Sequence, residues 1–115
     1  MGDIEERLQR GIAFKVGGCY EEAIAEFQRV ISADDSDDEA HRQLGLVYGF
    51  TGLFDESLEE LKKAVELNPQ NIGARNDLAM TCAMLGMYGE AKAGFMAVLE
   101  IDPSNELARR ELVYL

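Results

Sequence analysis

The sequence predicts an all-α protein: a stack of three helix–turn–helix hairpins followed by one further helix. The first observation is a period of thirty-four residues, which links Tyr20, Phe54 and Tyr88 and continues without an insertion. The second is the spacing of apolar residues in the second half of each unit, at i, i+4, i+7 and i+8. That spacing is typical of a helix with one buried side. Helical units that repeat at this period stack on their neighbours and bury a shared core.

Several positions of each unit carry the period at once. A glycine, a small residue and two larger apolar residues recur in register. They are Gly18, Gly52 and Gly86; Ala23, Ser57 and Ala91; Phe27, Leu61 and Phe95; and Val30, Ala64 and Val98. We therefore predict three units, at residues 4–37, 38–71 and 72–105. Residues 106–115 are expected to form a last helix, which caps the stack or begins a fourth unit.

The helix ends are predicted by glycine, proline and short polar residues at fixed places. A glycine falls where the first helix of each unit must stop, because glycine adopts the left-handed C-cap conformation without steric cost. An Asp or Asn precedes each new first helix, where its side chain can accept a hydrogen bond from a free backbone N–H. Pro69 and Pro103 are expected to end the preceding helix two residues earlier. The capping residues are Asp37, Asn71 and Asn105.

These positions resemble the tetratricopeptide repeat family. The second unit contains the family's Leu-Gly-x-x-Tyr segment as Leu44, Gly45 and Tyr48, whereas the third has Cys82 at the tyrosine position. In the first unit Arg10 replaces the usual leucine, as expected of a terminal repeat with one face toward water. The resemblance covers residues 4–105. It implies a right-handed superhelical stack whose first helices line a concave groove that binds peptides or helices of other proteins.

The resemblance also assigns residues to that groove. Its apolar members would form a continuous patch of the kind that marks an interaction site, and methionine adapts to partners of different shape. Lys15, Arg42 and Asn76 would orient the ligand. The assigned residues are Leu8, Ile12, Lys15, Val16, Arg42, Leu46, Phe50, Asn76, Met80, Ala83, Met84 and Tyr114. We predict that this groove binds an apolar helical or extended segment of a partner; packing between adjacent helices is the alternative for some of these side chains.

Co-chaperone members of the family hold the C-terminal Asp carboxylate of a chaperone tail with lysines and asparagines, through charge-assisted hydrogen bonds. The resemblance places the corresponding positions at Leu8, Ile12, Gln43, Gly73 and Asp77. None of them is a lysine or an arginine, and Asp77 would repel the carboxylate. The sequence therefore argues against a clamp for chaperone C-terminal tails.

The composition argues against several other partners. The chain has 11 basic and 22 acidic residues and a net charge of −11. Nucleic acids and anionic membranes attract basic surfaces, so neither is expected as a partner. No apolar run is long enough to span a membrane, and the acidic start lacks the features of a secretory signal. We therefore expect a cytoplasmic protein in which Cys19 and Cys82 are reduced.

No catalytic site, metal site or cofactor is expected. His41 is the only histidine, and no nucleophile or second ligand lies near it in sequence, so we expect it on an exposed or half-exposed helix face. The acidic run from Asp34 to Glu39 lacks the glycine and the spaced glutamate of a calcium loop, which favours carboxylates that cap helices. Cys82 is expected to be an inert buried thiol, and Cys19 an exposed one.

Self-association is the alternative to binding a different protein. The chain ends in Glu-Leu-Val-Tyr-Leu, which is apolar where a capped stack would carry charge. Such an edge could pair with a second copy or insert into its groove, and the protein would then act as a structural scaffold. A piece of a longer repeat protein would have the same kind of edge.

Overall fold

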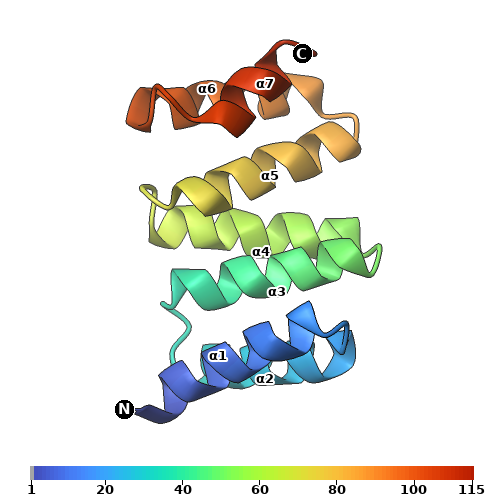
Figure 1. The fold of residues 1–115 in the computed structure, drawn as a ribbon, viewed down its shortest axis with the longest axis vertical. Helices are drawn as coiled ribbons and strands as arrows, with labels where there is room; N and C mark the ends of the chain where they lie inside the picture. The colour runs from blue at the N-terminus through green and yellow to red at the C-terminus, as the bar shows by residue number, and fades with distance from the viewer. Residues whose placement is uncertain (1) are drawn as a thin grey trace.

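The computed structural model describes residues 2–115, and over this range the chain forms seven helices and no strand. The helices are α1 (Gly2–Val16), α2 (Tyr20–Ala33), α3 (Asp38–Phe50), α4 (Phe54–Leu67), α5 (Ile72–Met84), α6 (Tyr88–Ile101) and α7 (Glu106–Leu112). The hairpins α1–α2, α3–α4 and α5–α6 follow one another along the long axis, with the two termini at opposite ends (Figure 1). The predicted all-α stack of hairpins with a last helix is confirmed. None of the helices in the described range is both long and apolar enough to cross a membrane.

The predicted helix ends are also confirmed. The three glycines after α1, α3 and α5 have positive φ angles of 79°, 83° and 79°, the conformation that favours glycine. Each predicted capping side chain accepts a hydrogen bond of 3.0 Å from the backbone N–H three residues later. Helices α4 and α6 end two residues before Pro69 and Pro103.

The core includes two clusters of buried side chains, one toward each end of the stack, and further buried residues such as Leu61 and Ala64 between them. The first core cluster contains Leu8, Ala23, Phe27, Val30, Ala40, Leu44 and Val47. The second contains Ala79, Phe95, Val98 and Ala108. Close packing within a hairpin depends on small residues: a Cβ at Gly11 would lie 2.5 Å from Phe27 Cε1, and one at Gly45 would lie 2.8 Å from Leu61 Cγ. These distances are far below van der Waals contact, so a larger residue at either position would require the neighbouring side chain to shift.

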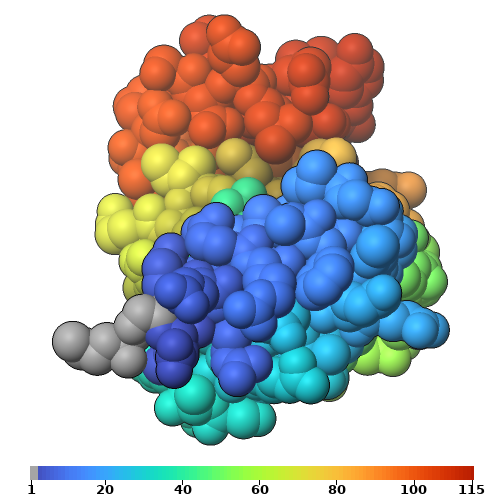
Figure 2. Space-filling view, turned by 60° about the horizontal axis from the view of Figure 1, so that its bottom comes forward, coloured from blue at the N-terminus to red at the C-terminus, as the bar shows by residue number. Residues whose placement is uncertain are grey.

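The N-terminal end of the stack, which faces the viewer in Figure 2, carries three arginines around one glutamate. The Glu26 carboxylate is buried there and accepts hydrogen bonds from Arg29 at 2.6 Å and Arg10 at 3.3 Å. Arg10 stands where the next two repeats have Leu44 and Leu78. The first repeat thus has the polar outer face that is expected of a terminal repeat.

The odd-numbered helices form one layer of the stack. Helix α3 contacts α1 and α5 in addition to its own hairpin partner α4. We call the surface shared by α1, α3 and α5 the inner face. Most of the predicted groove residues of the three repeats lie on these helices at this surface, and Leu8 and Asn76 are buried beneath it.

Candidate functional site

The C-terminal halves of α3 and α5 contribute the apolar part of the inner face. Leu46, Phe50, Met80 and Met84 line a single pocket of about 160 Å³. Its other lining residues are Gly49 of α3, Phe54 and Ser57 of the first turn of α4, and Asp77 and Thr81 of α5. Phe50 and Met84 keep 59% and 62% of their surface exposed. Four predicted groove residues therefore lie together, and two of them have apolar surface that the fold leaves uncovered. We call these four residues the apolar pocket.

The apolar surface extends toward the first hairpin. Val16 has the same repeat position as Phe50 and Met84, and it too is exposed. The ring of Phe50 packs against that of Tyr20, with 5.9 Å between ring centroids. Ile12 is half-buried, because it packs against the first core cluster. The column of exposed apolar side chains thus runs through all three hairpins.

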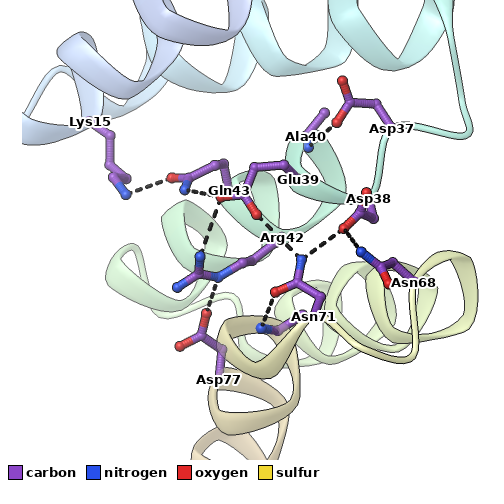
Figure 3. Close-up of polar contacts among 11 residues, drawn as sticks. Lys15, Asp37, Asp38, Glu39, Ala40, Arg42, Gln43, Asn68, Asn71 and Asp77 are labelled. Carbon is purple, nitrogen blue, oxygen red and sulfur yellow. Dashed lines mark hydrogen bonds and ion pairs between the residues drawn. The ribbon is translucent and has the colours of Figure 1, made fainter.

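The N-terminal halves of α3 and α5 carry polar side chains that bond to one another (Figure 3). Arg42 donates from Nε to Asp77 Oδ2 at 2.7 Å and from Nη1 to Glu39 Oε2 at 3.3 Å. Lys15 Nζ donates to Gln43 Oε1 at 2.6 Å. Gln43 Nε2 in turn donates to Glu39 Oε2 at 3.1 Å. We call these five residues the polar network; it joins α1, α3 and α5.

The acidic run continues this network toward the loops. Asp37 caps α3 by accepting from Ala40 N, as predicted for these carboxylates. Asp38 Oδ2 accepts from Asn71 Nδ2 at 2.8 Å and from Asn68 Nδ2 at 3.2 Å. The run therefore caps α3 and ties the start of α3 to the loop between α4 and α5. Within residues 2–115 no group of three His, Cys, Asp or Glu side chains is arranged to hold a metal ion.

The charges of the polar network are held in a partly desolvated environment. Burial and the nearby Arg42 charge lower the pKa of Lys15. Burial alone would lower the pKa of Arg42, but its contacts with Asp77 and Glu39 outweigh that effect and raise it. Burial raises the pKa of Asp77 even though Arg42 acts in the opposite direction. Each of these groups depends on its neighbours for compensation, which limits what it can offer to a ligand.

Two predicted groove residues lie in the interior, which corrects the prediction for them. Leu8 is 6% exposed in the first core cluster. Asn76 is 7% exposed, and its Nδ2 donates to Asn105 Oδ1 at 3.3 Å. Both have the same repeat position as Arg42, on the side of each odd-numbered helix that the next repeat covers. A side chain as short as leucine or asparagine stays covered there, whereas the longer Arg42 side chain reaches the inner face.

The other predicted groove residues have different surroundings. Lys15 and Arg42 belong to the polar network, and Ala83 is half-buried. Tyr114 is exposed beyond the end of α7, thirty-four residues after Met80. The prediction omitted Glu39, which accepts hydrogen bonds from two members of the network. Glu39 and Arg42 are three residues apart on one helix, a spacing at which side chains of opposite charge can pair. This spacing was the signal in the sequence that could have identified Glu39.

His41 is buried, which corrects the expectation of an exposed or half-exposed position. Its Nδ1 lies 2.7 Å from Glu60 Oε1, and its Nε2 lies 2.9 Å from the backbone oxygen of Asp35. The ring therefore ties α4 to the loop before α3. The two cysteines are as expected: both are free thiols, Cys19 exposed and Cys82 buried.

Comparison with known proteins agrees with this architecture. The sequence model described as tetratricopeptide repeat matches residues 51–112, which is more than half of the chain. The chain belongs to the tetratricopeptide repeat family. Tetratricopeptide repeats are protein-interaction modules, and this chain is one of them. No curated protein matches the sequence significantly.

Solved structures of tetratricopeptide repeat domains have the same fold. The first TPR of Spaghetti (RPAP3) bound to the HSP90 peptide SRMEEVD has a TM-score of 0.94 and 24% identity, over 98% of this chain and 90% of that one. The Arabidopsis OM64 TPR domain has a TM-score of 0.92 and 19% identity, over 99% and 94% of the two chains. The second TPR domain of human RPAP3, in complex with the HSP70 peptide SGPTIEEVD, has a TM-score of 0.88 and 26% identity, over 96% of each chain.

Proposed function

We propose that the inner face binds an amphipathic helix of another protein, with apolar side chains in the apolar pocket and basic residues on the opposite side of the bound helix. The observation that carries the proposal is the exposure of Phe50 and Met84, which the fold leaves uncovered although both are large and apolar. Full burial of such a side chain contributes roughly 1.5–3 kcal/mol. Covering the pocket is therefore a substantial driving force for association.

The shape of the apolar pocket supports a ligand with discrete apolar anchors. A pocket of about 160 Å³ has room for one large side chain, and a second anchor can pack along Val16 and Phe50. Two of the four residues of the apolar pocket are methionines, whose flexible thioether chains adapt to the shape of the anchor. A helix that presents anchors at i, i+3, i+4 and i+7 meets these requirements.

The charge of the chain supports a basic partner. On the inner face the cations Lys15 and Arg42 are balanced by the anions Glu39 and Asp77. The net charge of −11 therefore comes from the rest of the surface. A negative field of this kind accelerates association with positively charged partners and disfavours acidic ones.

We propose further that the ligand differs from the acidic peptides bound by the two RPAP3 domains named above. In this chain the cations of the inner face are already bonded to Asp77, Glu39 and Gln43. The space beside Gly73 is filled by Arg42: a Cβ at Gly73 would lie 2.6 Å from Arg42 Cζ. Releasing Arg42 to hold a carboxylate would leave Asp77 without its cation, at a cost that the new contact must exceed.

The proposal can be tested with a designed helical peptide that has leucines at i, i+3, i+4 and i+7 and lysines on its other face. Met84→Glu should weaken binding of this peptide at least about tenfold, because it places a charge in the apolar pocket. Met96→Glu is the matched control: Met96 is 52% exposed on α6, outside the pocket, and the change in charge is the same. Calorimetric titration measures both affinities.

The matched pair separates apolar contact from nonspecific attraction. Either substitution makes the chain more acidic, so binding that rested on charge alone would strengthen in both variants. Equal affinities for the Met84→Glu and Met96→Glu variants would contradict the proposal. A peptide of the same composition with its leucines spread around the helix should bind weakly to all three proteins.

A second candidate function is a scaffold that associates with itself. Val113 and Tyr114 favour it, because both are exposed apolar residues beside the last helix. Light scattering over a range of concentrations tests it. A dimer that Met84→Glu converts to a monomer would assign the apolar pocket to a second copy, whereas a monomeric wild type leaves the pocket to a different protein.

A further inference from the structure

A second pocket, of about 180 Å³, lies where α4, α5 and α6 meet. It shares no residue with the apolar pocket of the inner face. Its lining residues are Lys62, Arg75, Leu78, Ala79, Cys82, Met87, Glu90 and Gly94. We call it the Cys82 pocket.

The Cys82 pocket lies at a position that an aromatic ring fills in the other repeats. Phe14, Tyr48 and Cys82 are thirty-four residues apart. The rings of Phe14 and Tyr48 both pack against the first core cluster. The hydroxyl of Tyr48 also accepts a hydrogen bond from Gln28 Nε2 at 3.4 Å, across the junction with the preceding repeat. Lys62, which lines the pocket, stands thirty-four residues after Gln28. The third repeat thus keeps the surroundings of the ring without the ring.

On α6, a smaller residue than in the other repeats lines the pocket. Gly94 stands where the first two repeats have Glu26 and Glu60. A Cβ at Gly94 would lie 3.0 Å from Ala79 Cβ, so the backbones of α5 and α6 approach closely at this point. No side chain from position 94 enters the space that Cys82 leaves open.

We propose that the Cys82 pocket binds a phenolic ring from outside the chain, in the position that the Tyr48 ring occupies in the preceding repeat. Leu78, Ala79 and Met87 would contact the faces of the ring, and Lys62 would meet the hydroxyl as Gln28 meets that of Tyr48. The volume is adequate, since apolar cavities of about 150 Å³ in proteins bind benzene.

The thiol of Cys82 is compatible with such a ligand. Burial raises the pKa of Cys82, and the nearby Glu90 carboxylate acts in the same direction. The side chain therefore stays a neutral thiol at physiological pH, and neutral sulfur makes favourable contacts with aromatic rings.

The probe is p-cresol, the side-chain analogue of tyrosine, titrated into the whole chain while methyl NMR signals are followed. Binding should be saturable, with a dissociation constant on the order of 1 mM for a ligand of this size. The methyl signals of Met87 and Ala79 should shift, whereas those of Met84 in the apolar pocket and Met96 on α6 should not. Absence of a saturable shift at Met87 in the wild type overturns the proposal.

Two variants make the test specific. Cys82→Tyr supplies the missing ring from within the chain and should abolish the Met87 shift. Cys82→Ala removes the sulfur contact but keeps the space open, so it should still show a saturable Met87 shift, with weaker binding than the wild type. Wild-type affinity in a folded Cys82→Tyr variant contradicts the proposal. N-acetyltyrosinamide distinguishes the two sources of a phenolic ring: tighter binding than p-cresol assigns the pocket to a tyrosine of a partner, and weaker binding assigns it to a free phenol.

Discussion

The two ends of the inner face are built from the same helices but differ in what their side chains already do. At the N-terminal ends of α3 and α5, Arg42 and Asp77 bond to each other and to the rest of the polar network. At the C-terminal ends of the same helices, Phe50 and Met84 keep more than half of their surface exposed, although Phe50 packs against Tyr20. Both ends carry residues that the sequence analysis predicts for the groove, Arg42 at one end and Phe50 and Met84 at the other.

The difference shows that a repeat position alone does not make a ligand contact. A polar side chain in a stack of repeats can be satisfied by the neighbouring repeat, and a partner must then displace an existing contact. An exposed apolar side chain has no such contact to lose, and its burial is favourable whatever covers it. In the proposed function the apolar end therefore supplies most of the binding energy, whereas the polar end joins neighbouring helices of the stack.

The strongest test of this contrast is the double substitution Leu46→Glu with Phe50→Glu. It places two charges in the apolar pocket and should weaken binding of the leucine and lysine peptide by about 100-fold or more. The helical content, measured by circular dichroism, should stay close to that of the wild type, because neither side chain belongs to a core cluster. Unchanged affinity in a folded variant would remove the apolar pocket from the account.

Arg42→Ala tests the polar end of the inner face. It should lower the stability of the fold more than it lowers the affinity for the peptide. It leaves the half-buried Asp77 carboxylate without its cation, which should lower the free energy of unfolding by about 1–3 kcal/mol. Affinity for the peptide should fall less than in the double variant, because the four apolar side chains are unchanged, although Asp77, which also lines the pocket, loses its cation. Urea denaturation measures the first quantity and calorimetric titration the second.

A double-mutant cycle checks that the loss belongs to the ion pair. If Arg42→Ala destabilises by leaving Asp77 unpaired, adding Asp77→Ala should restore part of the stability. A double variant that is as unstable as the sum of the single variants would mean that the two side chains contribute independently.

The smallest effect is expected for Glu39→Gln. Glu39 is at the exposed edge of the polar network, and exposed pairs contribute about 0.2–1 kcal/mol. Glutamine keeps an oxygen that can accept from Arg42, so the free energy of unfolding should fall by less than about 1 kcal/mol. A larger loss, measured by urea denaturation, would show that the charge of Glu39 holds the network together.

The fold could be predicted from the sequence because the residues that end and cap each helix favour one local conformation, wherever the neighbouring repeats lie. Glycine is needed where φ is positive after α1, and the Asp37 side chain caps α3 wherever the neighbouring repeats lie. Periodicity then places the hairpins in order, since each hairpin buries its apolar side only against the next. The residues of the apolar pocket were predicted only through the family resemblance, with packing between helices as the alternative; their exposure comes from the structure.

The side-chain contacts between helices could not be predicted from the sequence in the same way. The sequence places Arg42 on the inner face, but its partner Asp77 lies thirty-five residues further along the chain. His41 pairs with Glu60 on the adjacent helix, which a single helix's pattern does not reveal. Leu8 and Asn76 show that coverage by the next repeat depends on side-chain length as well as on position. These contacts and the burial of these side chains depend on distances between helices, which cannot be read from the repeat period.

The most direct measurement is methyl NMR of the methionines during titration with the leucine and lysine peptide. Met80 and Met84 report on the apolar pocket, Met87 on the Cys82 pocket and Met96 on the outside of α6. We predict saturable shifts at Met80 and Met84 with Met96 unchanged, and no saturable shift with the acidic peptide SRMEEVD. Shifts spread over all four methionines, or a response at the inner face only to the acidic peptide, would contradict the account.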